Sequence, residues 1–415
     1  MIHVLKSTWP LLLGLMLLML GNGMQGSLLG IRGGLEQMDT FQLSVVTSGY
    51  FAGFLFGSRM VPAMIRKVGH VRVFAALGSM ISAVLILYAV LPNWVAWSLL
   101  RVVIGFCFSG VYISAESWLN NAASNEQRGQ VLSLYLIVQM IGIVAAQALL
   151  NLGDPRDYLL FVIPSVLVSL AFTPILLSAK PAPAFAATKP LSFGRLYAAS
   201  PLAFVGIFLL GSVFSVQSGM AAVWGTEQGL SVRQITLFIA SYYVGGLVAQ
   251  YPIGWLSDRM DRRILIFGLS ILGAAVLFLP VFATLPFLML LGVGAVGGAV
   301  SNPLYSLLLA YVNDNLDAAD MASASAGLLF INGIGAISGP VIAGWMMGII
   351  GPSGFFLFTA LLFVMLTGYT VWRMWSGRPA PEVTSAYRAV SPNATAIVTG
   401  ATMAEADQAG PDDKD

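Results

Sequence analysis

The chain has 415 residues, of which 58% are hydrophobic and only 9% are charged, and its mean hydropathy is +0.85. Because about a quarter of the residues in soluble globular proteins are charged, this composition excludes a soluble fold and predicts a membrane protein. The net charge of +2 gives no reason to expect nucleic acid as a partner. One cysteine, Cys107, and two histidines are too few for a disulfide framework, and we expect neither a metal site nor a cofactor.

Twelve segments are long and apolar enough to cross a bilayer, which takes about 20 residues in a helix. Residues 11–20 and 271–282 are apolar on every face, which favours helices over the alternating strands of a β-barrel. We therefore predict an all-α polytopic membrane protein with two pseudo-symmetric six-helix bundles. The expected spans are 9–31, 43–65, 72–92, 94–118, 129–151, 158–179, 201–225, 234–257, 264–284, 286–311, 321–349 and 354–375.

The segments that flank the second bundle differ in composition from the spans. Residues 180–200 are rich in Pro and Ala and carry basic side chains, which predicts a cytoplasmic linker between an N-terminal bundle at 1–179 and a C-terminal bundle at 201–376. Residues 377–415 turn polar, with three aspartates among the last four residues. They are expected to form a disordered cytoplasmic tail.

The two halves repeat each other at an offset of 192 positions. Four residues of the first half, Gln25, Gln42, Tyr50 and Gly53, have the same residue types at the matching places of the second half. Each half also has a basic loop after its second span. The chain is therefore an internal duplication.

Positive charge is distributed unevenly over the loops. With both termini in the cytoplasm, sixteen of the 20 Lys and Arg fall on the cytoplasmic side and three on the other side. Cytoplasmic loops carry an excess of Lys and Arg, so this orientation is favoured. We expect a multi-pass monomer in the bilayer of the inner (plasma) membrane.

The loop after the eighth expected span carries the most specific motif, Gly254-x-x-x-Asp258-Arg259-x-Asp261-Arg262-Arg263. It resembles the signature G-x-x-x-D-R-x-G-R-R/K of the major facilitator superfamily (MFS) of secondary transporters, which also consist of two six-helix halves joined by a linker. The resemblance covers residues 1 to about 376 and implies the MFS fold. Together with Ala115-Glu116-Ser-Trp118-Leu119-Asn120, the loop is similar to the YcaD-like branch of the superfamily.

The resemblance implies that this loop is a latch in which Asp258 meets the N-terminus of a helix of the same half. We expect that helix to be the eleventh span, which follows Asp320, because a helix N-terminus carries partial positive charge. In the first half the motif is degraded: Arg66 stands at the place of the Asp, and Lys67 and Gly69 keep the register. The alternative for both loops is that the basic residues only determine topology.

Two charged residues within the spans are candidates for function. Arg101 and Gly105 match the R-x-x-x-G element of the family, which implies a substrate anchor or a neighbour of a proton site. An arginine at depth costs about 2.5 to 3.5 kcal/mol on insertion scales, so it should face a cavity or a partner unless it snorkels outward. Glu116 is the candidate proton site, and an ion pair with Arg128 is the alternative.

Polar residues at mid-depth are expected where the halves meet, since such transporters bind substrate there. Gln139 and Asn332 are related by the repeat, and we expect them to belong to one central site. The alternative is that such amides only hold helices together. The candidate substrate-binding residues are Gln25, Tyr50, Arg101, Tyr112, Gln139, Gln217, Tyr242, Tyr243, Asn302, Tyr305 and Asn332.

These features predict secondary active transport of a small polar or weakly anionic organic solute by alternating access. The chain has no nucleotide-binding loop, so an ion gradient, with the proton as the expected coupling ion, or the gradient of the solute should drive it. Efflux of amphipathic compounds by proton antiport is the alternative within this class. A non-transporting sensor or scaffold is the alternative from another class, and enzymatic activity is not expected.

Overall fold

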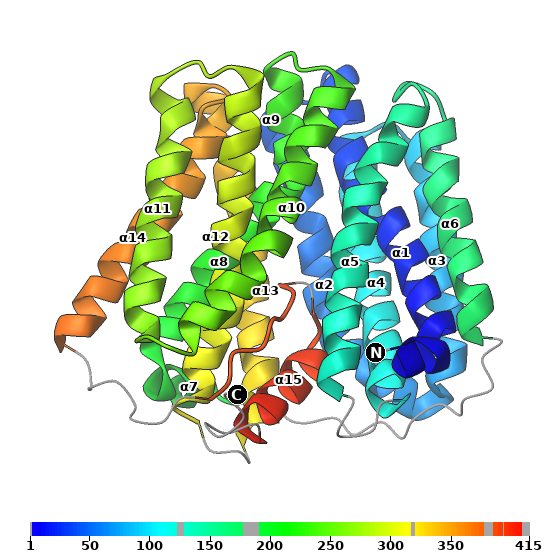
Figure 1. Ribbon diagram of the computed structural model, residues 1–415. Helices are drawn as coiled ribbons and strands as arrows, with labels where there is room; N and C mark the ends of the chain where they lie inside the picture. Colours follow the sequence, from blue (N-terminus) through cyan, green and yellow to red (C-terminus); the bar gives the residue numbers. More distant parts are fainter. Residues whose placement is uncertain are drawn as a thin grey trace.

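The computed structural model describes residues 2–122, 128–176, 191–316, 320–376, 385–392 and 394–408. In these ranges the chain is helical and contains no strand. Figure 1 shows the long helices standing side by side, with those of the first half in one group and those of the second half in the other. The helices of the first half are α1 (Ile2–Leu35), α2 (Thr40–Val68), α3 (His70–Val90), α4 (Trp94–Ala122), α5 (Arg128–Leu149), the short 3-10 helix η2 (Leu150–Leu152) and α6 (Leu159–Leu176).

The second half follows with the same order of long helices. Its elements are α7 (Phe193–Ala199), α8 (Pro201–Gly219), α9 (Ala221–Glu227), α10 (Val232–Ser257), α11 (Arg262–Phe282), α12 (Phe287–Asn313), α13 (Met321–Ile350), α14 (Gly354–Ser376) and α15 (Ala396–Gln408).

The described residues contain ten helices that are long and apolar enough to span a membrane. Helices α2 and α6 hold the two remaining places of the six-plus-six arrangement; α2 is less apolar than the ten, and α6 is shorter than they are. The seventh expected span, 201–225, is divided at Met220 into α8 and α9. The predicted architecture of a polytopic all-α protein is confirmed, with these differences in its spans.

The duplication is visible where α2 and α10 begin. Asp39 accepts a hydrogen bond from the backbone N–H of Gln42 at 2.7 Å, and the side chain of Gln42 accepts one from the backbone N–H of Asp39 at 3.1 Å. Ser231 and Gln234 form the same capping box at 3.3 and 2.9 Å. A capping box satisfies N–H groups that the first helical turn leaves without partners. The repeat of Gln42 at position 234 therefore serves helix initiation.

Glycines bring two helices of each half into close contact. A Cβ atom at Gly53 of α2 would lie 1.9 Å from a carbonyl oxygen of α4, and one at Gly105 of α4 would lie 2.0 Å from a carbonyl oxygen of α2. Cβ atoms at Gly245 and Gly298 would lie 1.9 and 1.8 Å from carbonyl oxygens of α12 and α10. Small residues allow membrane helices to approach in this way. The pairs α2/α4 and α10/α12 are therefore packed backbone to backbone.

The two ends of the bundle differ in how the halves meet. We call the end at which α2 and α10 finish the basic end, because Lys67, Arg259 and Arg263 lie there. Toward the opposite end the halves bond directly. Thr40 Oγ1 donates to the carbonyl of Gly344 at 3.0 Å, and Asn151 on η2 donates to the hydroxyl of Thr236 on α10 at 3.1 Å.

The C-terminal segment differs from the expected disordered tail. Residues 396–408 form α15, which packs against α4 and α5 of the first half and against α12 and α13 of the second. Figure 1 shows α15 at the basic end between the two groups of helices. Residues 385–406 contain only two charged side chains, Arg388 and Glu405, which pair with each other at 3.2 Å. This nearly uncharged run can be buried, unlike the acidic residues that follow it. The expectations for 377–384 and 409–415 lie outside the described residues.

The expected linker at 180–200 also contains structure. Residues 193–199 form α7, and the backbone N–H of Leu191 donates to the carbonyl of Ser323 on α13 at 2.9 Å. The last part of the linker is therefore bound to the second half. Residues 177–190 are outside the described ranges.

Candidate functional site

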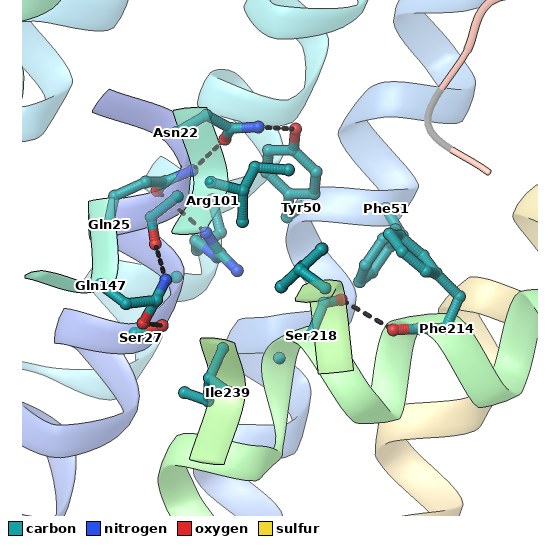
Figure 2. A pocket seen from close by; sticks show the side chains of 15 residues that line it. Asn22, Gln25, Ser27, Tyr50, Phe51, Arg101, Gln147, Phe214, Ser218 and Ile239 are labelled. Carbon is teal, nitrogen blue, oxygen red and sulfur yellow. Dashed lines mark hydrogen bonds between the residues drawn. The ribbon is translucent and has the colours of Figure 1, made fainter. Parts of the chain in front are cut away.

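A cavity of about 60 Å³ lies between the two halves (Figure 2). A water molecule needs about 10 to 15 Å³ of such space, so in this conformation the cavity has room for a few waters. The first half contributes α1, α2, α4 and α5 to its walls, and the second half contributes α8 and α10. The lining residues are Asn22, Gly23, Gln25, Gly26, Ser27, Tyr50, Phe51, Arg101, Ile143, Gln147, Phe214, Ser218, Gly219, Ile239 and Tyr243.

Arg101 is the charged residue of this lining. Its Nη1 donates to Gln25 Oε1 at 2.9 Å, and its guanidinium lies 4.9 Å from the centre of the Tyr50 ring. Only 5% of Arg101 is exposed, so the side chain points into the protein and does not snorkel outward. Its Nε has no hydrogen-bond partner among the described atoms. A buried cation with an unused donor favours an anionic or polar group beside it.

A chain of amides holds the partner of Arg101 in place. Gln25 Nε2 donates to Asn22 Oδ1 at 2.9 Å, which leaves Gln25 Oε1 to accept from Arg101. Asn22 Nδ2 in turn donates to the hydroxyls of Tyr112 at 2.7 Å and Tyr50 at 3.2 Å. Figure 2 shows Asn22, Gln25 and Tyr50 gathered around the guanidinium. The orientation of Gln25 is therefore fixed by donors and acceptors on both of its amide atoms.

The remaining walls of the cavity contrast in polarity. On the first half, Gln147 accepts a hydrogen bond from Ser27 at 2.9 Å and donates to the carbonyl of Gly23 at 3.2 Å. On the second half, the hydroxyl of Ser218 donates to the carbonyl of Phe214 on its own helix at 2.8 Å. The polar groups that face the cavity thus come mostly from the first half.

A smaller cavity of about 30 Å³ adjoins the first one, with Tyr50, Phe51 and Phe214 in both linings. Its other lining residues are Asn332, which is polar, and a set without polar side chains: Phe54, Leu55, Leu329, Gly333, Ala336 and Pro392. Asn332 Nδ2 donates to the carbonyl of Pro392 at 3.4 Å. This second cavity therefore contacts the C-terminal segment.

Gln139 lies apart from the Arg101 network. Its amide donates to the hydroxyl of Tyr135 at 2.6 Å, and Tyr135 donates to the carboxylate of Glu116. Neither cavity described above has Gln139 in its lining, whereas Asn332 lines the smaller one. That Gln139 and Asn332 belong to one substrate site stays a prediction.

Four candidates of the second half are buried within that half. Gln217 accepts a hydrogen bond from Ser301 at 2.9 Å, and Asn302 donates to a backbone carbonyl of its own helix at 3.3 Å. Tyr242 and Tyr305 are 3% and 1% exposed. The lining of the Arg101 cavity includes none of the four, so their role in binding stays a prediction.

Sequence reasoning found Gln25, Tyr50, Arg101 and Tyr243 in the lining, and it missed Asn22 and Gln147. Asn22 precedes Gln25 by three positions, which puts the two amides on one face of α1. That spacing was the available signal.

Glu116 is fully buried on α4. Its carboxylate accepts hydrogen bonds from the Tyr135 hydroxyl, from the backbone N–H of Thr395 at 3.2 Å and from the Thr395 hydroxyl. The side chain of Arg128, the alternative partner, lies outside the described atoms. Glu116 therefore connects α4 of the first half to the C-terminal segment.

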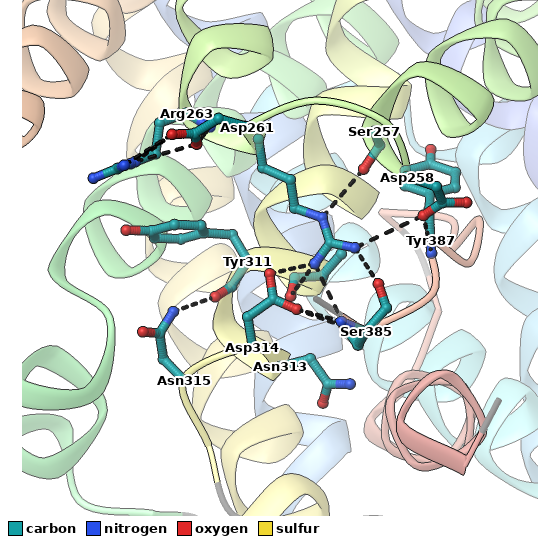
Figure 3. A network of polar contacts seen from close by, with 12 residues as sticks. Ser257, Asp258, Asp261, Arg263, Tyr311, Asn313, Asp314, Asn315, Ser385 and Tyr387 are labelled. Carbon is teal, nitrogen blue, oxygen red and sulfur yellow. Dashed lines mark hydrogen bonds and ion pairs between the residues drawn. The ribbon is translucent and has the colours of Figure 1, made fainter. Parts of the chain in front are cut away.

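Arg262, in the motif loop at the basic end, contacts Ser257, Asp314 and Ser385, which Figure 3 shows close together. Only 2% of Arg262 is exposed, and its guanidinium has hydrogen-bond and ion-pair partners inside the protein. It pairs with Asp314, and it donates to the carbonyl of Ala310 at 3.0 Å, to the hydroxyl of Ser257 at 3.2 Å and to the carbonyl of Ser385. Breaking a buried pair of this kind is strongly destabilising, because the remaining charge is left unpaired.

The partner of Asp258 differs from the expected helix N-terminus. Asp258 Oδ1 accepts a hydrogen bond from the backbone N–H of Tyr387 at 2.8 Å and lies 3.8 Å from Arg262 Nη2. A Cβ atom at Gly254, one turn earlier, would lie 2.6 Å from the Tyr387 ring. The leading glycine and the aspartate of the motif thus hold the C-terminal segment, while Asp320 stands at the start of α13.

The other motif residues act locally. Asp261 caps α11 by accepting from the backbone N–H of Arg263 at 2.9 Å, and their side chains pair at 2.8 Å. Partial burial opposes ionisation of Asp261, but the hydrogen bonds and charge of Arg263 outweigh it and lower the pKa of Asp261. The guanidinium of Arg259 lies 4.2 Å from the centre of the Trp255 ring.

The degraded loop of the first half is simpler. Lys67 is exposed, and Gly69 joins α2 to α3 with a φ of 88°, which favours glycine. The backbone conformation alone therefore accounts for a glycine at position 69, and a latch is not needed to explain it.

Comparisons with known proteins agree with this architecture. Residues 202–403 match the sequence profile described as Major Facilitator Superfamily, and residues 13–172 match the one described as Sugar (and other) transporter. The "Uncharacterized MFS-type transporter YfkF" of Bacillus subtilis (strain 168) is 26% identical over 333 residues, which are 78% of this chain and 83% of that protein. An "Uncharacterized MFS-type transporter" of Yersinia pestis (strain Pestoides F) is 26% identical over 369 residues, 86% and 91% of the two chains.

Solved structures show the same fold. A mutant of the nucleoside transporter NupG superposes with a TM-score of 0.76 at 15% identity, over 88% of this chain and 99% of that one. A bacterial homolog of the human lysosomal transporter Spinster, in an inward-facing and occupied conformation, gives a TM-score of 0.70 at 14% identity, over 91% and 98%. At these identities the likeness concerns the fold alone. Assignment to the YcaD-like branch stays a prediction.

Proposed function

Because the chain belongs to the major facilitator superfamily, we propose that it carries a small polar or weakly anionic organic solute across the membrane by alternating access. The observation that carries the proposal is the cavity between the halves, where Arg101 has an unused donor and a partner amide fixed by Asn22. A binding site at the interface of two rocking halves is open to each side in turn.

The two walls of the cavity favour different parts of such a solute. Arg101, Gln25 and Gln147 offer charge and hydrogen bonds on the first half. Phe51 of the first half and Phe214 of the second offer apolar surface beside them. We expect a polar or anionic group to bind at Arg101 and a planar or apolar part to lie against the phenylalanines. Nucleosides, the substrates named for NupG, combine such groups and belong among the compounds to be tested.

The orientation and coupling complete the proposal. The basic end is proposed to face the cytoplasm, since Lys and Arg concentrate there, and the membrane is proposed to be the bacterial inner membrane. Proton coupling is proposed to involve Glu116, the carboxylate buried on α4. The transporter is proposed to act as a monomer.

Efflux of amphipathic compounds is a second candidate function. The smaller cavity favours it, because Phe54, Leu55 and Leu329 give that cavity an apolar lining next to the polar one. A solute that occupied both cavities would place its apolar part there.

Ligand-induced thermal stabilisation of the purified protein tests the proposal. The panel contains organic anions, nucleosides, neutral polar solutes and amphipathic cations. A ligand at 100 times its Kd stabilises the folded protein by about 2.7 kcal/mol, so binding can be detected as a rise in the melting temperature. We expect stabilisation by compounds with a polar or anionic group, and loss of this effect in Arg101→Lys. Arg72→Lys, at an exposed arginine of α3, is the matched control and should bind as the parent does. Stabilisation by amphipathic cations alone, unchanged in Arg101→Lys, would replace the main proposal with the second candidate.

A further inference from the structure

The C-terminal segment, residues 385–392 and 394–408, lies between the two halves at the basic end, and we call it the C-terminal strap. Its helix α15 packs against α4 and α5 on one side and α12 and α13 on the other. Figure 1 shows α15 and the run before it between the two groups of helices. Ala394, Thr395 and Val398 are 0%, 1% and 4% exposed, so this part of the strap is interior structure.

The strap is anchored on the motif loop at its first residues. The backbone N–H and the hydroxyl of Ser385 both donate to Asp314 at 2.8 Å, and the carbonyl of Ser385 accepts from Arg262. Tyr387 donates its backbone N–H to Asp258 and places its ring against Gly254. Figure 3 shows Asp258 beside Tyr387 and Asp314 beside Ser385.

The middle of the strap is bonded to the second half. The hydroxyl of Ser306 on α12 accepts from the backbone N–H of Val390 at 2.9 Å and donates to its carbonyl at 3.1 Å. Asn313, at the end of α12, donates to the carbonyl of Met403 on α15 at 3.0 Å. Side chains of α12 therefore hold backbone groups of the strap at two places.

The contact with the first half is concentrated at Thr395. Its backbone N–H and its hydroxyl both donate to Glu116 of α4. The hydrogen bonds described for the strap thus reach both halves, and those to the first half meet at one carboxylate. Any separation of α4 from α12 and α13 at this end must break the contact between Glu116 and Thr395 or detach the rest of the strap.

The strap also borders the candidate site. Pro392 lines the smaller cavity, which shares Tyr50, Phe51 and Phe214 with the cavity of Arg101. A solute that moved from Arg101 toward the basic end would meet Pro392 and Thr395 in the space between the halves.

We propose that the C-terminal strap is an autoinhibitory plug, which closes the basic-end opening of the transport path and is released when the contact between Thr395 and Glu116 breaks. This inference rests on the proposed transport function. Because the anchors at Asp258, Arg262 and Asp314 are numerous and belong to the second half, the strap stays with that half when it opens. The motif loop is thereby the seat of the plug.

Access of a polar maleimide to a buried cysteine tests the plug without knowledge of the solute. Leu329→Cys in a Cys107→Ser background places one thiol in the smaller cavity, behind Pro392. The full-length protein in detergent micelles is compared with a deletion of 377–415 and with Thr395→Val, which removes a hydroxyl bonded to Glu116. Thr402→Val is the matched control, because that hydroxyl bonds to the carbonyl of Val398 within α15.

We expect slow labelling of the full-length parent and of Thr402→Val. The deletion and Thr395→Val should be labelled about tenfold faster or more, since both lose the hydrogen bond from the Thr395 hydroxyl to Glu116. Thermal unfolding of each variant verifies that it is folded. Parental labelling rates in Thr395→Val and in the folded deletion would overturn the plug.

The two proposals fail separately in this design. Fast labelling of the deletion, combined with no stabilisation by any compound of the panel, would support the plug and remove the support for solute binding. Stabilisation that depends on Arg101, combined with unchanged labelling, would retain the transport proposal and overturn the plug.

Discussion

The two halves of the molecule contribute unequally to the cavity between them, although one is a duplicate of the other. Gln25 and Gln217 stand at matching places, but Gln25 accepts from Arg101 and faces the cavity, whereas Gln217 accepts from Ser301 within the second half. At 192 positions after Arg101 the chain has Val293. The charge that gives Gln25 its role has no counterpart.

The features that the duplication preserved are structural. Helix caps repeat at Asp39 and Ser231, and close helix packing repeats at Gly53 and Gly245. Backbone geometry thus stays common to the two halves while side chains at the interface diverge. The first half supplies the polar groups of the cavity, and the second half supplies the seat of the C-terminal strap.

The largest difference between the halves is expected at their basic loops. Arg262→Met should destabilise the protein by about 3 to 5 kcal/mol, because Asp314 would remain as a buried, unpaired charge. Lys67→Met, in the exposed loop of the first half, should change stability by less than about 0.5 kcal/mol. Denaturant unfolding of the purified proteins measures both. Equal stability of the two variants would contradict the assignment of the strap's seat to the second half.

The next largest effect is expected from the charge that only the first half carries. Arg101→Ala should weaken binding of the stabilising compounds by about 10- to 100-fold, as expected for a lost hydrogen bond to a charged group. Val293→Ala, at the matching place of α12, should bind with parental affinity. Calorimetric titration of both variants measures the ratio. If the two substitutions weakened binding equally, the cavity would be symmetric in function.

A smaller effect should distinguish the two matched amides. Gln25→Leu should weaken binding by about tenfold, because Arg101 loses its acceptor and reorients. Gln217→Leu, which removes an acceptor for Ser301, should change the affinity by less than about twofold while lowering the melting temperature. The same titration, together with thermal unfolding, provides both readouts. A stronger effect of Gln217→Leu on affinity would move the site toward the second half.

The smallest effect concerns the helix starts that follow the two loops. Asp261 caps α11, whereas Gly69 at the matching place before α3 has no side chain to do so. Since the folded-state pKa of Asp261 is lowered, its contribution is present above the unfolded-state pKa and is lost as the pH falls through the folded-state value. Asp261→Asn should be less stable than the parent by at most about 1 kcal/mol at neutral pH, because the pair is partly exposed. A difference that persisted unchanged in acid would show that the charge of Asp261 is not responsible.

Arg101 and Gln25 were predictable from the sequence because a charge inside a span needs a partner and because Gln25 belongs to the repeat. The repeat did not identify Asn22 and Gln147, since the residues at their matching places are Phe214 and Gly339; for Asn22 the signal was its spacing from Gln25. The repeat identifies only side chains that are the same in both halves. The polar lining of the cavity comes from side chains that differ between the halves, such as Arg101, Asn22 and Gln147.

The fold itself was more accessible, because the span lengths and the repeat determine six helices in each half. The strap was missed for a compositional reason. Its apolar residues stand between segments that are richer in charge, and an average over 377–415 conceals a run that contains only Arg388 and Glu405 as charged residues. The motif loop could not reveal its partner either, since Asp258 bonds to a backbone N–H of Tyr387, and any residue except proline could supply that donor.

The glycine contacts between α2 and α4, and between α10 and α12, fix the distance between the two helices of each pair. Carbonyl oxygens occupy the space in which a side chain would stand, so neither pair can slide without a collision of its backbones. A pair of spin labels on α2 and α4 should therefore report one distance in every state of the protein. Labels on α4 and α12 should report a distribution that changes with solute and with removal of the strap. The first pair calibrates the second, so that a shift between the halves can be separated from a distortion within one of them.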